Sequence, residues 1–355
     1  MNRALIALLL LGVVAMPAAA DVAAGLEAFR RGDYEAARAA WQPLAESGNP
    51  VAQFNIGILY RRGLGVTADN RQAVGWFERA AVGGHTTAQF NLGLIYEQGI
   101  GVSVDKAAAL RWYRRAAKVT QIDDGFEEAR ARAQFRLADL LLKGDSVNRS
   151  AGMYWLQRSG ESGNAEAQFR LALAYAAGKD LVRDSVAAAR WFERAAEQGH
   201  LSAQVNLATI YETGAGLSRD ETKAAHWYAQ AAEQNAVVAQ INLGSLYAQG
   251  RGVARDDRAA LKWYSRAANQ GALEAYFNLG VLYEHSTELS DEQNAYFWYA
   301  VAAKAGHKKA SLRLVSLRAK VGDGEAAAIE RRAAVWRPQK ERKVQRLETT
   351  AQPRK

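Results

Sequence analysis

The sequence predicts an all-α protein whose helix-turn-helix repeats stack into a solenoid. Two observations predict this class. Good helix formers dominate the composition, while proline accounts for only 5 of 355 residues. A pattern of small, aliphatic and aromatic residues with helical spacing also recurs along the chain, about every 36 residues. Because one such unit cannot bury its own hydrophobic face, neighbouring units must share a core.

Residues 1–20 have the composition of a secretory signal peptide. A positively charged start is followed by an uncharged apolar run at residues 4–16, and three alanines at residues 18–20 form a small-residue cleavage site before Asp21. The alternative is an uncleaved membrane anchor, but the run is shorter than the roughly 20 residues that a span needs. We therefore expect a periplasmic or secreted protein with no membrane span in the mature chain.

Cysteine content and charge narrow the function further. The chain has no cysteine, which excludes disulfides and thiolate metal sites. The formal net charge is +9, of which the signal peptide carries +1 and residues 337–355 carry +5. This leaves only +3 for residues 21–336, so we expect no nucleic-acid partner.

The first half of each repeat, called helix A here, begins with an alanine that recurs from unit to unit. In AQFNIGILY (52–60), the residues at offsets 0, 4 and 8 lie on one helical face. Offset 5 is always Gly or Ala, which predicts that a neighbouring helix approaches closely. Helix A begins at the following alanines: Ala52, Ala88, Ala133, Ala167, Ala203, Ala239 and Ala275.

The second half, called helix B, is predicted to begin behind a polar cap. These caps are Asp69, Asp105, Asn148, Asp184, Asp220, Asp256 and Asp291. A tryptophan follows seven residues after each one, and we expect these rings to form the core that holds helix B against helix A. They are Trp76, Trp112, Trp155, Trp191, Trp227, Trp263 and Trp298.

A glycine-rich link such as Gly63–Val66 joins the two helices in most units. Its first glycine suits the left-handed cap of helix A. The units that begin at Ala133, Ala167 and Ala275 lack the full pattern, and the last of them has residues 285–288 (HSTE) instead.

These features resemble the Sel1-like repeat family of the tetratricopeptide-repeat-like superfamily. The shared motifs are A-x-x-x-LG-x-x-Y, G-x-GV, D-x-x-x-A-x-x-WY and AA-x-x-G, over residues 51 to about 310. The resemblance implies an α-solenoid wound as a right-handed superhelix, in which helix A lines the concave face. It also implies a scaffold or adaptor that binds partner proteins or peptides, including components of envelope assembly.

Five regions are predicted along the chain. They are a signal peptide (1–20), an N-terminal capping helix pair (21–50), seven repeats (51–309), C-terminal capping helices (310–336) and a disordered basic tail (337–355). The spacing between two units is also longer at residues 118–128. We interpret this acidic insert as an extended helix and surface turn, or as an acidic lip on a binding groove.

The residue just before each Leu-small pair of helix A is our candidate binding position. An asparagine there can donate to and accept from a peptide backbone, while arginine favours a carboxylate. The alternative is that these side chains bridge neighbouring helices. The positions, called the ladder, are Asn55, Asn91, Arg136, Arg170, Asn206, Asn242 and Asn278.

Catalytic chemistry is not predicted. Ser103 and Lys106 match the S-x-x-K string of penicillin-recognising enzymes, but the companion strings are missing and Ser103 falls in a link. His85, His200 and His307 share one repeat position, which predicts a structural turn rather than a metal site. We therefore expect no cofactor and no metal. The rival interpretations are a cell-wall or β-lactam-directed hydrolase and a polysaccharide-binding envelope scaffold.

Overall fold

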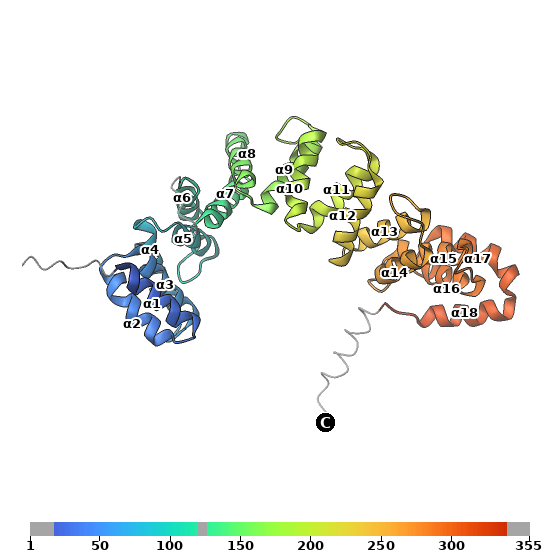
Figure 1. Cartoon of the computed structure of the whole chain (residues 1–355), viewed down its shortest axis with the longest axis horizontal. Coiled ribbons are helices and arrows are strands. Elements are labelled where there is room, and N and C mark those ends of the chain that lie inside the picture. The colour runs from blue at the N-terminus through green and yellow to red at the C-terminus, as the bar shows by residue number, and fades with distance from the viewer. Residues whose placement is uncertain (1–17, 120–125, 339–355) are drawn as a thin grey trace, which may run out of the picture. The chain divides into compact units, whose positions relative to one another are not determined.

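The computed structural model describes residues 18–119 and 126–338 of the chain, and within these two ranges every regular element is an α-helix (Figure 1). The predicted all-α repeat fold is confirmed. In chain order the helices are α1 (Ala18–Arg30), α2 (Tyr34–Glu46), α3 (Pro50–Arg62), α4 (Asn70–Val82), α5 (Thr86–Gln98), α6 (Lys106–Ala117), α7 (Glu127–Leu141), α8 (Ser146–Glu161), α9 (Ala165–Ala177), α10 (Ser185–Glu197), α11 (Leu201–Thr213), α12 (Glu221–Glu233), α13 (Val237–Gln249), α14 (Asp257–Ala268), α15 (Leu273–His285), α16 (Glu292–Lys304), α17 (Lys308–Val321) and α18 (Asp323–Val335).

The chain divides into two compact units, Met1–Asn164 and Ala165–Lys355. In each unit, consecutive helices pack as hairpins, and each hairpin also packs on the next one. Helix A of the repeats corresponds to the odd-numbered helices α3 to α15, and helix B to the even-numbered helices α4 to α16. At the C-terminal end, α18 packs against α16, and the Trp336 ring lies edge-on to those of Tyr276 and Trp298.

Three predicted regions are covered only in part by the described residues. Most of the predicted signal peptide (1–17), residues 120–125 of the insert and residues 339–355 of the basic tail lie outside them. No helix in the described part of the chain is both long and apolar enough to cross a membrane.

Helix B begins as predicted at six of its seven caps. At α4, for example, Asp69 Oδ1 accepts hydrogen bonds from the backbone N–H groups of Arg71 and Gln72, at 2.8 and 3.0 Å. The prediction that Asn148 caps the remaining one of these helices, α8, is wrong. α8 begins three residues earlier, because Asp145 Oδ1 accepts from the backbone N–H of Asn148 at 2.9 Å. Aspartate and asparagine both cap helices well. Asp145 is the cap because its carboxylate lies near the free backbone N–H groups at the start of α8.

The buried ring of most hairpins is the aromatic residue after the tryptophan, which corrects our expectation. Phe77, Tyr113 and Tyr228 are fully buried. Most of the tryptophans before such rings are half-buried, although Trp263 is buried. An arginine three residues further on covers several indoles, with the guanidinium carbon 4.5–5.7 Å from the ring centroid. These pairs are Arg79–Trp76, Arg115–Trp112, Arg194–Trp191 and Arg266–Trp263.

The small residue of helix A makes room for that buried ring. A Cβ atom added to Gly93 would lie 2.3 Å from the nearest Tyr113 ring atom, and one added to Gly57 would lie 2.7 Å from Phe77. These contacts explain why helix A accepts a residue that lowers helix stability by about 1 kcal/mol relative to alanine.

Replacing two of the helical glycines by alanine is therefore expected to change the stability of the protein in opposite directions. Gly93→Ala forces a methyl group into the Tyr113 ring, and we expect it to lower the free energy of unfolding by about 1–3 kcal/mol. Gly75, on α4, has no other group within 4 Å of its added Cβ. Gly75→Ala is the matched control and should raise stability by about 0.5–1 kcal/mol. Urea denaturation followed by circular dichroism measures both. Equal changes in the two variants would contradict the packing argument.

The second glycine of each link brings neighbouring repeats into backbone contact. A Cβ on Gly252 would lie 2.1 Å from the carbonyl oxygen of Glu221, the first residue of α12. In the last repeat this contact is replaced by a hydrogen bond between two side chains. Ser286 Oγ donates to Oδ2 of the buried Asp257 at 2.6 Å, and Asp257 is the first residue of α14. The HSTE sequence thus keeps the repeats together without the glycines.

Candidate binding surface

All seven ladder residues are half-buried. Asn55, Asn91 and Arg136 lie on α3, α5 and α7 of the first unit. The other four lie on α9, α11, α13 and α15 of the second unit. The seven residues are therefore all partly accessible to solvent and lie at one register of helix A within their unit.

Arg136 is engaged by a carboxylate of the preceding repeat. Its Nη2 lies 2.6 Å from Oε1 of Glu97, at the end of α5. Oε2 of Glu97 accepts from the Tyr113 hydroxyl at 2.7 Å. Burial and Glu97 both raise the pKa of Tyr113, so the phenol keeps its proton and donates. This Tyr–Glu–Arg group links helix A, helix B and the next helix A.

The same arrangement occurs twice in the second unit. The Tyr228 hydroxyl donates to Glu212 at 2.9 Å, and it also hydrogen-bonds the ladder residue Asn242. Burial raises the pKa of Tyr228 to about 12. Arg251 pairs with the other oxygen of Glu212, although this arginine lies in the link after α13 rather than on helix A. The described structure therefore assigns part of the ladder to contacts between repeats.

The second occurrence is at Glu284, which lies between the Tyr299 hydroxyl at 2.6 Å and Arg313 at 3.5 Å. Sequence reasoning missed these glutamates and Arg313. The signal was present, because Arg313 follows Ala310 by the same three residues that separate Arg136 from Ala133.

The remaining ladder residues have different surroundings. Asn206 Nδ2 donates to the Ser202 carbonyl at 2.7 Å, and Arg170 Nε donates to Glu166 at 2.8 Å. Asn278 lines a small cavity. The Nδ2 of Asn55 is buried and has no hydrogen-bond partner among the described residues.

A second polar series, also missed from the sequence, holds the repeats together. In six of the seven repeats a buried glutamine follows the first alanine of helix A. In five of these the amide donates to a carbonyl near the end of the preceding helix, at Gln53, Gln89, Gln134, Gln204 and Gln240. Gln204 reaches Ala196 O at 3.2 Å, and Gln240 reaches Ala232 O at 3.1 Å. Gln234 Nε2 then donates to Gln204 Oε1 at 2.8 Å. These contacts satisfy carbonyls that a helix end leaves free.

The three repeated histidines have the structural role that their spacing predicts. Nδ1 of His85 accepts from the backbone N–H of Ala88 at 3.2 Å, which caps α5. The ring stacks on Phe54 at 4.4 Å between centroids. His200 and His307 repeat both contacts. No cluster of three metal-ligating side chains occurs among the residues that the structure describes.

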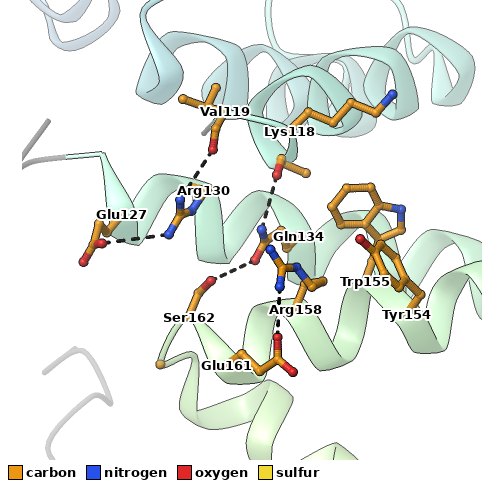
Figure 2. Close-up of a pocket in the computed structure, with 12 residues that line it drawn as sticks. Lys118, Val119, Glu127, Arg130, Gln134, Tyr154, Trp155, Arg158, Glu161 and Ser162 are labelled. Carbon is orange, nitrogen blue, oxygen red and sulfur yellow. Dashed lines mark hydrogen bonds and ion pairs between the residues drawn. The ribbon is translucent and has the colours of Figure 1, made fainter. Parts of the chain in front are cut away.

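An open groove of about 750 Å³ lies beside the long insert of the first unit (Figure 2). Its walls come from the end of α6, from α7 and from α8. Tyr154 is 57% exposed and lies edge-on to Trp155. Gln134 crosses the floor, donating to Ala117 O and accepting from Ser162 Oγ, both at 3.2 Å. Aromatic rings thus line the groove beside amide and hydroxyl groups.

The described residues give little support to the predicted acidic lip on this groove. Glu127 lines it, but the carboxylate pairs with Arg130 at 3.8 Å. Glu128 pairs with Arg132 at 2.5 Å. Asp123, Asp124 and Gly125 lie outside the described residues.

The string at Ser103 has the surroundings of a helix start. Ser103 and Lys106 are both exposed, and between them Asp105 Oδ1 accepts from the backbone N–H of Ala108 at 2.9 Å. Lys106 is the first residue of α6. The motif therefore coincides with an ordinary cap.

Comparison with known proteins identifies the repeat. A family model described as Sel1 repeat matches seven segments, residues 50–85, 86–118, 131–164, 165–200, 201–235, 237–271 and 273–307. A search of curated protein sequences found no match.

Several solved structures are similar to this chain. A Sel1 repeat protein from Oxalobacter formigenes is 30% identical with a TM-score of 0.54, over 70% of this chain and 96% of that one. A protective antigen with an SLR fold, present in uropathogenic Escherichia coli strains, is 24% identical with a TM-score of 0.39, over 95% and 88%. A putative sel1 repeat protein from Klebsiella pneumoniae subsp. pneumoniae is 24% identical with a TM-score of 0.33, over 55% and 96%.

Proposed function

Because the chain belongs to the Sel1 repeat family, whose members generally act as protein-interaction scaffolds, we propose that it is an exported scaffold that binds a protein or peptide through the ladder. Binding, rather than catalysis, is its function. Export rests on the composition of residues 1–20, which is that of a signal peptide.

One observation carries the assignment to the ladder. In the second unit, Asn206, Asn242 and Asn278 occupy the same position on successive A helices, 36 residues apart in sequence, and all are half-buried. A half-buried amide that is open on one side can pair with the backbone of an extended peptide. Rigid repeats place such groups in advance, which lowers the entropy lost on binding.

The two arginines of the ladder have a different role in this proposal. Arg136 already binds Glu97, and Arg170 already binds Glu166. Their charge is therefore largely used within the chain, and we assign recognition of the partner mainly to the asparagines. An acidic partner segment would compete with these internal carboxylates for the guanidinium groups.

The test is capture of crosslinked partners from an envelope extract, followed by titration of the identified partner. The triple variant Asn206→Ala/Asn242→Ala/Asn278→Ala is expected to weaken binding at least tenfold. Arg190→Ala/Arg258→Ala is the control, because both side chains are exposed on helix B. Circular dichroism checks that the variants remain folded. A folded triple variant that keeps every partner at wild-type affinity would eliminate the ladder as the binding site.

A second candidate, an envelope polysaccharide, is favoured by Tyr154 and Trp155 in the open groove. Exposed aromatic rings beside polar groups suit the apolar face and hydroxyls of a sugar. The same capture distinguishes the candidates. Glycan that is retained by the wild type and lost with Tyr154→Ala supports the polysaccharide, while protein partners lost only with the asparagine variant support the ladder.

A further inference from the structure

A carboxylate occupies the same position at three of the junctions between repeats. Glu97, Glu212 and Glu284 each follow the first alanine of their helix A by nine residues. Each accepts a hydrogen bond from the tyrosine hydroxyl of the following helix B, at 2.6–2.9 Å. Each also pairs with an arginine further along the chain, which lies in the next repeat for Glu97 and Glu212 and in α17 for Glu284. The fold thus contains a recurring carboxylate site.

The junction after α13 keeps the neutral part of this site but lacks its carboxylate and its arginine, since Thr287 stands twelve residues after Ala275 where Arg251 stands twelve residues after Ala239. Ala248 stands nine residues after Ala239, where Glu212 stands nine residues after Ala203. The neutral hydrogen-bonding groups around it are retained. Tyr264 corresponds to Tyr228, and Asn278 corresponds to Asn242.

A third neutral group, a hydroxyl, is present in both repeats. Thr209 Oγ1 lies 3.0 Å from the Tyr228 hydroxyl, and Ser245 hydrogen-bonds Tyr264 in the same way. Burial raises the pKa of Tyr264 to about 12, so its hydroxyl remains protonated. It can therefore donate a hydrogen bond, as the Tyr228 hydroxyl does to Glu212.

The missing side chain leaves a cavity of about 230 Å³. Ser245, Ala248, Tyr264 and Asn278 line it, together with His285 and the aliphatic side chains of α15. We propose that this cavity binds a carboxylate of the partner protein, which takes the place of the absent glutamate. The proposal rests on the scaffold function proposed above and names the chemical group recognised at one position of the ladder.

The charges around the cavity fit a carboxylate that enters from outside. Asp257 lies at the edge, but both of its oxygens are occupied, by Arg255 at 3.1 and 3.2 Å and by Ser286 at 2.6 Å. Arg255 pairs closely with it and is half-exposed, so its guanidinium can also face a ligand. Tyr264 and Asn278 then supply the neutral donors that orient the ligand oxygens.

The carboxylate could belong to an acidic side chain or to a chain terminus, and small probes distinguish these sources. Propionate represents a glutamate side chain, N-acetylglycine represents a C-terminus, and propionamide is the uncharged control. Each is titrated into the full-length chain at constant ionic strength, with the tyrosine rings and side-chain amides followed by NMR. We expect saturable shifts at Tyr264 and Asn278 with propionate, half-complete at millimolar concentration, and none with propionamide. Tighter binding of N-acetylglycine would assign the site to a terminus.

Two variants complete the test. Ala248→Glu supplies the carboxylate from the chain itself and is expected to abolish the shifts caused by propionate. Tyr264→Phe keeps the ring on Gly244 but removes the donor, and it is expected to weaken propionate at least fivefold. The proposal is overturned if the wild type shows no saturable shift, if propionamide acts like propionate, or if Tyr264→Phe binds as tightly as the wild type. Because no partner protein is used, failure here leaves the scaffold function standing and removes only the carboxylate site.

Discussion

Phe77→Ala is expected to lower the free energy of unfolding by about 3–5 kcal/mol. The Phe77 ring is fully buried on Gly57 and lies 5.6 Å from the Phe54 ring centroid. Removing it opens a cavity between α3 and α4, and the glycine opposite has no side chain with which to fill the gap. Urea denaturation of the full chain, followed by far-ultraviolet circular dichroism, measures the change.

The neighbouring tryptophan provides the comparison. Trp76 is half-buried, and the Arg79 guanidinium carbon lies 4.5 Å from its ring centroid. Trp76→Ala should therefore lower stability by only about 1–2 kcal/mol, although tryptophan is the larger side chain. If Trp76→Ala proves more destabilising than Phe77→Ala, the tryptophan, as the sequence suggested, is the ring that holds the hairpin together.

Acid is expected to destabilise the first unit through His85. Burial lowers the pKa of His85 from 6.5 to about 4, because the ring packs against Phe54 and Phe126 and has little contact with water. Below pH 6.5 the unfolded chain binds a proton that the folded chain excludes. The stabilisation is therefore complete above pH 6.5 and is lost as the pH falls towards 4, by about 3 kcal/mol in total.

His85→Asn isolates this contribution from the titration of the carboxylates. Asparagine caps helices well, and Asn49 already performs this role at the start of α3, where Oδ1 accepts from Ala52 N at 3.0 Å. Stability measured between pH 7 and 4 should fall less steeply in this variant than in the wild type. His226→Asn, whose ring is exposed on α12, should keep the wild-type dependence. Parallel curves for His85→Asn and the wild type would mean that His85 accepts a proton while folded.

The helices themselves follow from local chemistry. Alanines and aliphatic residues at helical spacing, with Asp69 or Asp220 before them, specify where a helix begins and which face it buries. The failure at Asn148 shows the limit of this reasoning. Asp145 and Asn148 are both good caps, and only the folded backbone decides which of them lies beside free N–H groups.

The choice between adjacent aromatic residues could not be made from the repeat alone. Trp76 and Phe77 recur with the same period, and neighbouring residues on a helix point about 100° apart. Which of them reaches the centre depends on how helix B is rotated against helix A. That rotation follows from the contact between Phe77 and Gly57, which belong to different helices.

The sequence by itself determined the all-α repeat fold, most of the helix starts and the register of the candidate ladder, because these depend on residues within one helix or one repeat. Only the tertiary structure decided which ladder side chains are engaged between repeats. Glu97 and Arg136, which pair with each other, are 39 residues apart in sequence. Ala248 and Asn278, which belong to different repeats, line the same cavity. The stacking of the hairpins determines which of these residues meet. Because the partners lie far apart in sequence, their contact cannot be predicted before the packing of the hairpins is known.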